Sequence, residues 1–364
     1  MRPETIEKLE RIVASAAALG RKLELRGGGS KADIGAPREA EIVDMTGFSG
    51  ILDYDPAELV LTCGAGTPLV EIEAAVAERG QMLAFEPFDH GPMFGRKAGA
   101  ATIGGVVAAG VCGSRRLSRG GARDHLLGFK AVSGRGEAFV GGGKVVKNVT
   151  GYDVCKLVAG SWGRLAALTE VTLKVLPMPQ VVRSLVVDGL EPAAAVALMS
   201  GAMASQADVA AACHSPGITV LRLEGFGPSV KARERLVRDM TEAETLAPRA
   251  GKAFWTGMRS PLPDASVLWR ISVPASRAPE VLEAIAGDWR MDWAGGLIWS
   301  ACEDPTWVRR AAEAAGGYAV LVRAPEAMRA EVPALHPPAP GVGRLEERVR
   351  RAFDPAGVFE TGRF

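Results

Sequence analysis

The sequence has no excess of charge of either sign. Its 364 residues include 43 Lys and Arg against 42 Asp and Glu, which leaves a net charge of +1. A nucleic-acid-binding surface needs a marked basic excess, so the balance argues against a general nucleic-acid partner. The hydrophobic fraction of 48% and the charged fraction of 23% are typical of a folded globular protein.

Cysteine and histidine are scarce and scattered. The cysteines are Cys63, Cys112, Cys155, Cys213 and Cys302, and the histidines are His90, His125, His214 and His336. No CxxC pair occurs, and the spacing fits neither a disulfide framework nor a zinc or iron–sulfur site. We therefore expect no metal site, and we expect the thiols to be small buried side chains in a reducing cytoplasm.

Long apolar runs are missing as well. The longest uncharged run, Ala98 to Ser114, consists mostly of Gly and Ala and is shorter than the roughly 20 apolar residues that span a bilayer. The polar N-terminus leads into no apolar signal-peptide core. The sequence therefore predicts a cytoplasmic protein with no transmembrane segment.

Glycine and tryptophan are abundant in different halves of the chain. Of the 44 glycines, 28 fall within the first 170 residues, whereas six of the seven tryptophans follow residue 250. These opposite gradients predict two domains, over residues 1–177 and 178–343, with the boundary near Pro177-Met178-Pro179. A last helix at about 344–353 and its tail, residues 344–364, are expected to return to the first domain.

The sequence pattern of the first half predicts short strands mixed with a few helices. One helix is expected at about 4–19 and another at about 68–79, where Thr67 is the expected cap and Pro68 the first helical residue. The expected strands are Lys22–Arg26, Glu41–Thr46, Gly50–Tyr54, Glu58–Thr62, Gly128–Val132, Glu137–Val140 and Ala166–Val175.

The second half alternates strands and helices, which predicts an open sheet covered by helices on one face. The expected strands are Val181–Val187, Thr219–Glu224, Val267–Val273, Leu297–Ala301 and Tyr318–Val322, and the helices are at about 191–204, 229–243, 277–286 and 304–315. Both halves together indicate an α+β fold with a smaller second domain.

The first motif with chemical meaning is Gly27-Gly28-Gly29-Ser30-Lys31, which directly follows a predicted strand. Successive glycines let backbone N–H groups converge on an anion and form a phosphate nest. Ser30 adds a hydroxyl donor and Lys31 adds charge. Taken alone, the motif fits an ordinary turn equally well.

The second motif runs from Gly99 to Gly110 as GAATIGGVVAAG. Thr102 can cap a short helix whose first turn contains Gly104 and Gly105. The free N–H groups and the positive end of that helix would then face a diphosphate. The alternative is a small-residue helix that packs tightly against a neighbour.

Two further segments continue the pattern. Residues 112–125, CGSRRLSRGGARDH, suit a loop that folds over a charged ligand, although each arginine there also fits a solvated surface charge. In the segment from Asn148 to Leu165, Asp153 is the expected cap of a helix, and Gly160 and Gly163 mark a tight turn into a strand.

Together these segments resemble the FAD-binding domain of the vanillyl-alcohol oxidase/PCMH flavoprotein family. The matching pieces are RGGGSK, AGAATIGGVVAAGVCGSRR, GGARDHLLG, NVTGYDVCKLVAGSWGRL and ALTEVTLKVLP, in the family's order over roughly residues 20–177. The resemblance implies a two-subdomain PCMH-type FAD-binding domain followed by the smaller α+β domain. Within the family the chain is most similar to the smaller FAD-binding subunits of bacterial glycolate oxidases.

The resemblance implies that Gly27 to Ser30 and Gly104-Gly105 hold the FAD pyrophosphate. Gly113 and Ser114 would lie by the ribityl and flavin region, and Leu168 would contact the cofactor through its backbone. The full set of expected FAD-binding residues is Gly27, Gly28, Gly29, Ser30, Lys31, Gly99, Thr102, Gly104, Gly105, Ala109, Gly113, Ser114, Arg123, Asp124, Gly160, Gly163, Leu168 and Thr169.

Many family members attach the flavin to a histidine in the first glycine loop. Here the loop reads Gly29-Ser30-Lys31, so we expect non-covalent FAD. An NAD site is disfavoured, because the Gly27-Gly28-Gly29 triplet lacks the G-x-G-x-x-G spacing of a dinucleotide fingerprint.

The sequence says less about the catalytic residues than about the cofactor. Stand-alone 2-hydroxy-acid dehydrogenases of the family carry a histidine-rich H-x-G-D-G-N-x-H stretch, which is missing here, and no catalytic base can be named. The favoured function is therefore the FAD subunit of a complex that oxidises glycolate to glyoxylate. A larger FAD subunit would oxidise this small hydroxy acid, and an iron–sulfur subunit would receive the electrons, so that the chain could be peripheral to the inner membrane.

Two alternatives stay open. One is a self-sufficient FAD-dependent dehydrogenase for a 2-hydroxy acid such as D-lactate. The other is a structural subunit with a vestigial flavin site, against which the intact glycine motifs count. The tail Glu360-Thr361-Gly362-Arg363 keeps the Gly-Arg of its relatives but has lost their Asn-Pro, which leaves a flavin contact there open.

Overall fold

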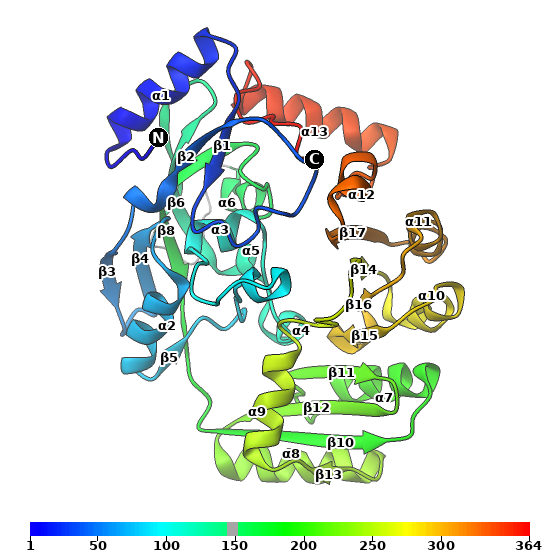
Figure 1. The fold of residues 1–364 in the computed structure, drawn as a ribbon. Coiled ribbons are helices and arrows are strands. Elements are labelled where there is room, and N and C mark those ends of the chain that lie inside the picture. Colours follow the sequence, from blue (N-terminus) through cyan, green and yellow to red (C-terminus); the bar gives the residue numbers. More distant parts are fainter. Residues whose placement is uncertain (144–151) are drawn as a thin grey trace.

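The computed structural model describes residues 1–143 and 152–364 of the chain. Asn148-Val149-Thr150-Gly151, the beginning of the segment from Asn148 to Leu165, therefore lies outside the described residues. The chain begins and ends on the same domain: the amino group of Met1 donates to the carbonyl of Ile42 at 2.7 Å, and the N–H of Leu23 donates to the carbonyl of Val358 at 2.8 Å (Figure 1).

The first domain begins with helix α1 (Ile6–Ala18) and the parallel pair of β1 (Leu23–Arg26) and β2 (Glu41–Asp44). The Thr5 hydroxyl caps α1 by accepting from the N–H of Lys8. Leu9 and Val13 of the helix are fully buried, and they pack with Leu23 and with the C-terminal Phe359. The C-terminal tail thus completes the core of the first subdomain.

An antiparallel sheet of five strands forms the other subdomain. Its strands, in spatial order, are β3 (Ile51–Asp55), β4 (Val60–Gly64), β8 (Ala166–Lys174), β6 (Leu126–Ser133) and β7 (Ala138–Gly142). The accompanying helices are α2 (Leu69–Glu78), α3 (Ile103–Ala108), α4 (Arg116–Arg119), α5 (Ala122–His125) and α6 (Val154–Val158), with 3-10 turns at Met45–Gly47 and Gly91–Phe94. A short pair, β5 (Gln81–Met82) and β9 (Leu176–Pro177), leads to the second domain.

The predicted cap of α2 is wrong. Pro68, not Thr67, is the N-cap residue, and no side chain caps this helix. The Thr67 hydroxyl donates to the carbonyl of Gly64 at 2.6 Å and accepts from the N–H of Gly50 at 2.9 Å. The Thr67 hydroxyl therefore forms its hydrogen bonds with the preceding turn and, contrary to the expectation, does not cap the helix. The expected cap at Asp153 is confirmed, because its carboxylate accepts from the N–H of Lys156.

The second domain is built on an antiparallel sheet of eight strands among the described residues. Their order is β13 (Glu244–Thr245), β10 (Val181–Asp188), β12 (Ile218–Gly225), β11 (Ala211–Ser215), β15 (Trp289–Asp292), β16 (Leu297–Ser300), β14 (Leu268–Ser272) and β17 (Tyr318–Arg323). Five of these strands were expected; β11, β13 and β15 were not, being short or rich in alanine and polar residues.

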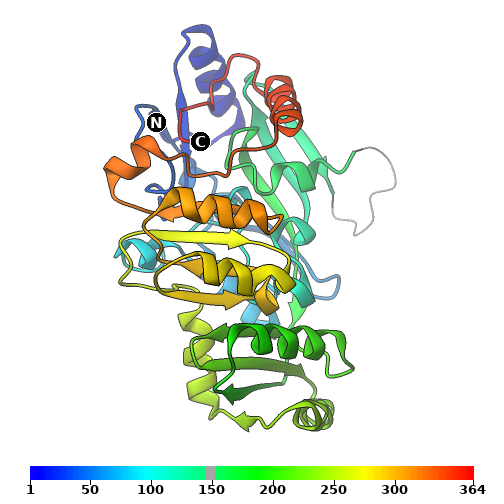
Figure 2. The same cartoon turned by 90° about the vertical axis from the view of Figure 1, so that its right-hand side faces the viewer.

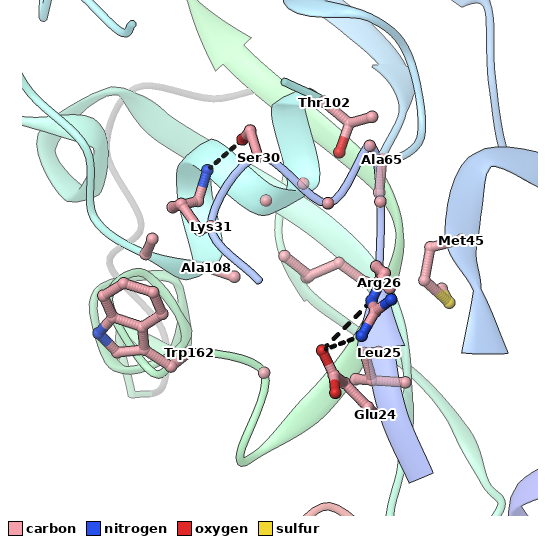
Figure 3. Close-up of a pocket in the computed structure, with 18 of the residues that line it drawn as sticks. Glu24, Leu25, Arg26, Ser30, Lys31, Met45, Ala65, Thr102, Ala108 and Trp162 are labelled. Atoms are coloured by element: carbon pink, nitrogen blue, oxygen red, sulfur yellow. Dashed lines mark hydrogen bonds and ion pairs between the residues drawn. The ribbon is translucent and has the colours of Figure 1, made fainter. Parts of the chain in front are cut away.

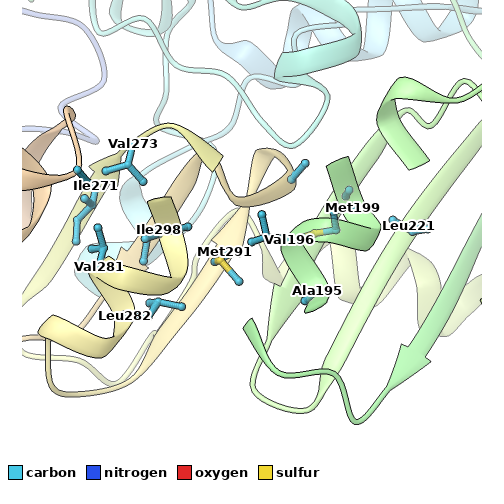
Figure 4. Close-up of a cluster of buried hydrophobic side chains, with 14 of the residues drawn as sticks. Ala195, Val196, Met199, Leu221, Ile271, Val273, Val281, Leu282, Met291 and Ile298 are labelled. Atoms are coloured by element: carbon cyan, nitrogen blue, oxygen red, sulfur yellow. The ribbon is translucent and has the colours of Figure 1, made fainter. Parts of the chain in front are cut away.

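Four helices cover one face of this sheet (Figure 2). They are α7 (Pro192–Ala204), α8 (Gly227–Met240), α10 (Ala278–Ala284) and α11 (Pro305–Ala314). In Figure 4, Val196 and Met199 of α7 and Val281 of α10 point toward the buried side chains of the strands. The strand residues in this view include Leu221, Ile271, Met291 and Ile298.

The expectation that helices cover only one face is wrong. Helix α9 (Pro248–Gly257) packs on the other face, where Trp255 joins Val186 and Val220. The remainder of that face lies against the first domain, since Trp299 and Val322 belong to the same buried cluster as Phe88. Helices α12 (Glu326–Glu331) and α13 (Pro340–Phe353) then lead back to the first domain. The exact domain boundaries stay a prediction.

Candidate FAD site and the adjoining cleft

The loop after β1 lies unusually close to the N-terminus of α3. A Cβ atom added to Gly28 would lie 1.4 Å from the carbonyl oxygen of Ala100, and one added to Gly27 would lie 2.1 Å from the Thr102 hydroxyl oxygen. Glycine is therefore required here because two backbone segments touch. Gly104 is equally confined, since its Cβ would lie 2.7 Å from the carbonyl oxygen of Ala65.

This contact leaves a group of backbone donors unused. Within residues 1–143 and 152–364, the N–H groups of Gly28 through Lys31 donate to no acceptor, and neither does that of Gly105 in the first turn of α3. Gly29 has a φ of +72°, a left-handed conformation that turns successive N–H groups to one side. Thr102 is the N-cap residue of α3 as expected, but its side chain makes no capping hydrogen bond. The loop thus has the backbone geometry of an anion nest, and its binding of a phosphate stays a prediction.

The nest is also positively charged. The Lys31 side chain is almost completely buried and its ammonium contacts only the Ser30 hydroxyl, at 3.4 Å, among the described residues. Burial lowers the pKa of Lys31 to about 8; the nearby Arg363 lowers it further and Asp89 opposes the shift. A buried cation without a carboxylate partner is costly, and an anion in the pocket would remove that cost.

The C-terminal tail adds a second cation. The guanidinium of Arg363 donates to the carbonyl of Ile34 at 2.8 Å and to that of Lys31, and it stacks on Trp162 with 5.3 Å between guanidinium and ring centre. Burial, together with the positive charge of Arg38, lowers the pKa of Arg363. The Gly-Arg pair at the end of the chain therefore forms part of the pocket wall.

These groups line one pocket (Figure 3). Eleven of the eighteen expected residues contribute to it: Gly27, Gly28, Gly29, Ser30, Lys31, Thr102, Gly104, Gly105, Ala109, Gly163 and Leu168. The sequence did not point to several others, namely Glu24, Leu25, Ala32, Met45, Ala65, Ala108, Trp162, Ala166 and Arg363. Trp162 reaches the pocket because Trp162 and Gly163 form a left-handed turn, whose N–H at Trp162 donates to Ala108 of α3.

The structure places the other seven expected residues elsewhere. Arg123 and Gly160 line a second cleft, which adjoins the pocket and shares Ala109 and Trp162 with it. Gly99 donates to Asp89, Asp124 accepts from the N–H of Gly121, and the Thr169 hydroxyl donates to the carbonyl of Lys130. Gly113 and Ser114 lie at the joint between the domains, where Ser114 donates to Asp292 at 2.7 Å. Their roles toward a cofactor stay predictions.

The second cleft lies between the first domain and the sheet of the second. Its polar lining comes from His90, Cys112, Arg116, Arg123 and Arg270, and its walls from residues such as Trp293, Trp299 and Val320. Three of the expected binding residues, Ala109, Arg123 and Gly160, line this cleft. One wall comes from the segment of residues 109–123, but Arg270, Trp293 and Trp299 come from the second domain, so no local spacing could have brought the two walls together.

A buried network of charges joins the two domains beside this cleft. Arg222 of β12 donates two hydrogen bonds to Glu86, at 2.9 and 2.8 Å, and Arg115 pairs with Glu224 at 2.8 Å. Burial raises the pKa of Glu86, but Arg222 and Arg115 outweigh it and hold that pKa at about 2. The network pairs two cations with two anions across the domain boundary.

Among the described residues, no group of three or more His, Cys, Asp or Glu side chains is arranged to hold a metal ion. No helix in this part of the chain is both long and apolar enough to cross a membrane.

The chain resembles known flavoproteins. The FAD binding domain family matches residues 1–142. The glycolate oxidase subunit GlcE of Escherichia coli (strain K12) is 37% identical over 347 residues, which cover 94% of this chain and 92% of that protein. A D-lactate dehydrogenase of Archaeoglobus fulgidus is 33% identical over 180 residues, but this match covers only 49% of the chain and 38% of the dehydrogenase.

Among solved structures, an alkyldihydroxyacetonephosphate synthase superimposes with a TM-score of 0.67 at 16% identity, over 98% of this chain and 76% of that one. At this level of identity the likeness shows the fold alone. It agrees with the α+β, PCMH-type architecture expected from the sequence.

Proposed function

The chain belongs to the PCMH-type FAD-binding flavoprotein family that includes the glycolate oxidase subunit GlcE, and on this basis we propose that it is the FAD-carrying subunit of a complex that oxidises glycolate to glyoxylate. The observation that carries the proposal is the full-length similarity to GlcE. The match to the D-lactate dehydrogenase covers only 49% of the chain, whereas the match to GlcE covers 94% of it.

FAD fits the pocket described above. The five unused N–H donors at Gly28 through Lys31 and at Gly105, with the buried Lys31 ammonium, match the donors and charge that a diphosphate requires. When bound, FAD supplies the electron-accepting chemistry, and the chain supplies the donors, the charge and the shielding from water. Since Gly27-Gly28-Gly29-Ser30-Lys31 offers no histidine, we propose that the flavin is held without a covalent bond.

The partners follow from the same proposal. A larger FAD subunit and an iron–sulfur subunit would share the reaction, with electrons leaving the flavin of this chain toward the iron–sulfur clusters. The complex would be cytoplasmic or peripheral to the inner membrane.

The test is expression of the chain alone and together with the two proposed partners. The chain alone should be yellow and should release FAD on acid treatment, while rapid glycolate-dependent dye reduction should require the complex. A colourless chain that cannot be reconstituted with FAD would contradict the flavin assignment. Equally fast dye reduction by the chain alone would favour the alternative, a self-sufficient hydroxy-acid dehydrogenase.

A further inference from the structure

The cleft beside the FAD pocket has a positively charged wall on the second domain. In the sheet register Arg270 of β14 lies opposite Trp299 of β16 and Val320 of β17. Paired residues of neighbouring strands share a face, and all three line the cleft. Arg270 is therefore directed at the first domain and at the end of the FAD pocket marked by Trp162.

A strained tryptophan holds this wall in place. Trp293 and Ala294 both have positive φ, +52° and +53°, a left-handed conformation that is strained for residues other than glycine. The N–H of Trp293 donates to the buried carboxylate of Asp292 at 2.7 Å, and its indole N–H donates to the carbonyl of Gly113 at 3.1 Å. Strain that is retained by specific buried contacts is characteristic of binding sites.

Two arginine guanidinium groups lie over the indole ring of Trp293. The guanidinium of Arg270 lies 4.8 Å from the ring centre and that of Arg116 lies 5.9 Å from it. Stacking on an aromatic ring orients a guanidinium and leaves its edge N–H donors free. Arg116 also pairs with the carboxylate of Asp124 at 3.4 Å. In the described part of the chain Arg270, in contrast, forms no hydrogen bond or ion pair, and no carboxylate lines the cleft there.

His90 supplies a group of a different kind. Its ring stacks on Phe88 with centres 4.6 Å apart, its residue is 8% exposed, and its Nδ1 has no hydrogen-bond partner. Burial lowers the pKa of His90 well below its ordinary value, and the charges of Lys31 and Arg270 add to this effect. The imidazole is therefore neutral at pH 7, and one of its nitrogens can accept a hydrogen bond.

We propose that this chain itself binds a small 2-hydroxy carboxylate in the cleft, with Arg270 and Arg116 as the partners of the carboxylate and His90 as the acceptor for the hydroxyl group. The inference rests on the proposed function, which it deepens: the substrate-type anion is bound beside the flavin of this chain and not only on a larger partner. Bidentate pairing with a guanidinium gives the carboxylate its orientation, and His90 distinguishes a hydroxy acid from a simple acid.

Calorimetric titration of oxalate into the FAD-loaded chain tests the carboxylate part. We expect one saturable site, at least tenfold weaker in Arg270→Met, because a charge-assisted hydrogen bond to a carboxylate is lost. Arg310→Met removes a cation from the exposed surface of α11 and should leave oxalate affinity unchanged. Arg116→Gln removes the second guanidinium that lies over Trp293, and it provides the same test if the Arg270→Met variant does not fold.

The role of His90 toward the hydroxyl group is tested by comparing the binding of glycolate with that of acetate. His90→Phe should weaken glycolate several-fold while leaving acetate unchanged, because only glycolate has a hydroxyl to lose its acceptor. Equal losses for both ligands would show that His90 only shapes the cleft and would overturn its assignment.

The flavin content of every sample is measured from its absorbance before titration. A chain without flavin contradicts the proposed function. A flavin-replete chain that shows no saturable oxalate binding, or that binds oxalate equally well as Arg270→Met and Arg116→Gln, contradicts the cleft assignment and leaves the FAD proposal standing.

Discussion

The FAD pocket and the adjoining cleft are built in opposite ways. The core of the pocket comes from two short glycine-rich motifs, the loop after β1 and the first turn of α3, and distant residues such as Trp162 and Arg363 complete its wall. The cleft is assembled from His90, Arg116, Arg270 and Trp293, which come from both domains. The predicted FAD pocket thus takes much of its lining from short motifs that can be recognised in the sequence, whereas the cleft at the domain boundary exists only once the domains have packed.

The largest effect is expected from Arg222→Met, which alters the buried charge network between the two domains. The change leaves Glu86 and Glu224 buried with one cation fewer, and breaking such a buried pair costs about 3–5 kcal/mol of unfolding free energy. Chemical denaturation measures the loss. Because the joint positions the cleft but not the glycine loop, the folded variant should lose oxalate affinity more than FAD affinity.

Arg238→Met provides the matched control for that experiment. Arg238 pairs with Glu234 on the exposed surface of α8, and an exposed pair of this kind contributes roughly 0–1 kcal/mol. Parallel loss of FAD and oxalate affinity in Arg222→Met would show that the two sites are not built independently.

The next largest effect is expected at Gly105 in the pocket. A Cβ there meets only ordinary contacts, 3.4 Å from the Thr102 hydroxyl oxygen and 3.8 Å from the Lys31 ammonium. Gly105→Ala should keep FAD, and Gly105→Asp should weaken it by about a hundredfold, since a carboxylate would neutralise Lys31 and repel the diphosphate. FAD titration by fluorescence quenching, with unfolding curves of both variants, measures this.

Gly105 is a sharper position than Gly104 for this purpose. A side chain at Gly104 would collide with the backbone of Ala65, so loss of flavin there could reflect misfolding alone. If Gly105→Asp binds FAD as well as Gly105→Ala does, the segment is not the phosphate site.

Features formed by residues close together in the sequence were easier to predict than features formed by distant residues. The glycine loop taken alone fitted an ordinary turn equally well, and it was assigned to FAD only because the later segments matched the family in the same order. The contacts that exclude side chains at Gly27 and Gly28 come from Thr102 and Ala100 of the second motif. The C-terminal Arg363 was left open because its contacts with Lys31 and Ile34 span more than 300 residues of sequence.

Other elements were missed for local reasons. Strand β11 reads Ala-Ala-Cys-His-Ser, which has little strand preference of its own, and it forms because β12 and β15 pair with it on either side. Thr67 was assigned to a helix cap because the pattern Thr-Pro is typical of one, whereas the turn at Gly64 satisfied its hydroxyl first. In each case tertiary contacts decided between local options.

The smallest expected effect is the pH dependence of FAD binding. Burial lowers the pKa of Lys31 to about 8, and phosphates would bind its protonated form, which would raise that pKa in the complex. The affinity is therefore complete below pH 8 and falls as pH rises through 8, by at most about tenfold per pH unit, until the pKa of the complex is passed. Lys31→Arg, which stays protonated, should flatten the profile between pH 7 and 9, and Lys31→Met should flatten it at an affinity about tenfold lower. A wild-type dissociation constant that does not change over this range would mean that Lys31 does not face the diphosphate, and the nest would then act through its backbone N–H groups alone.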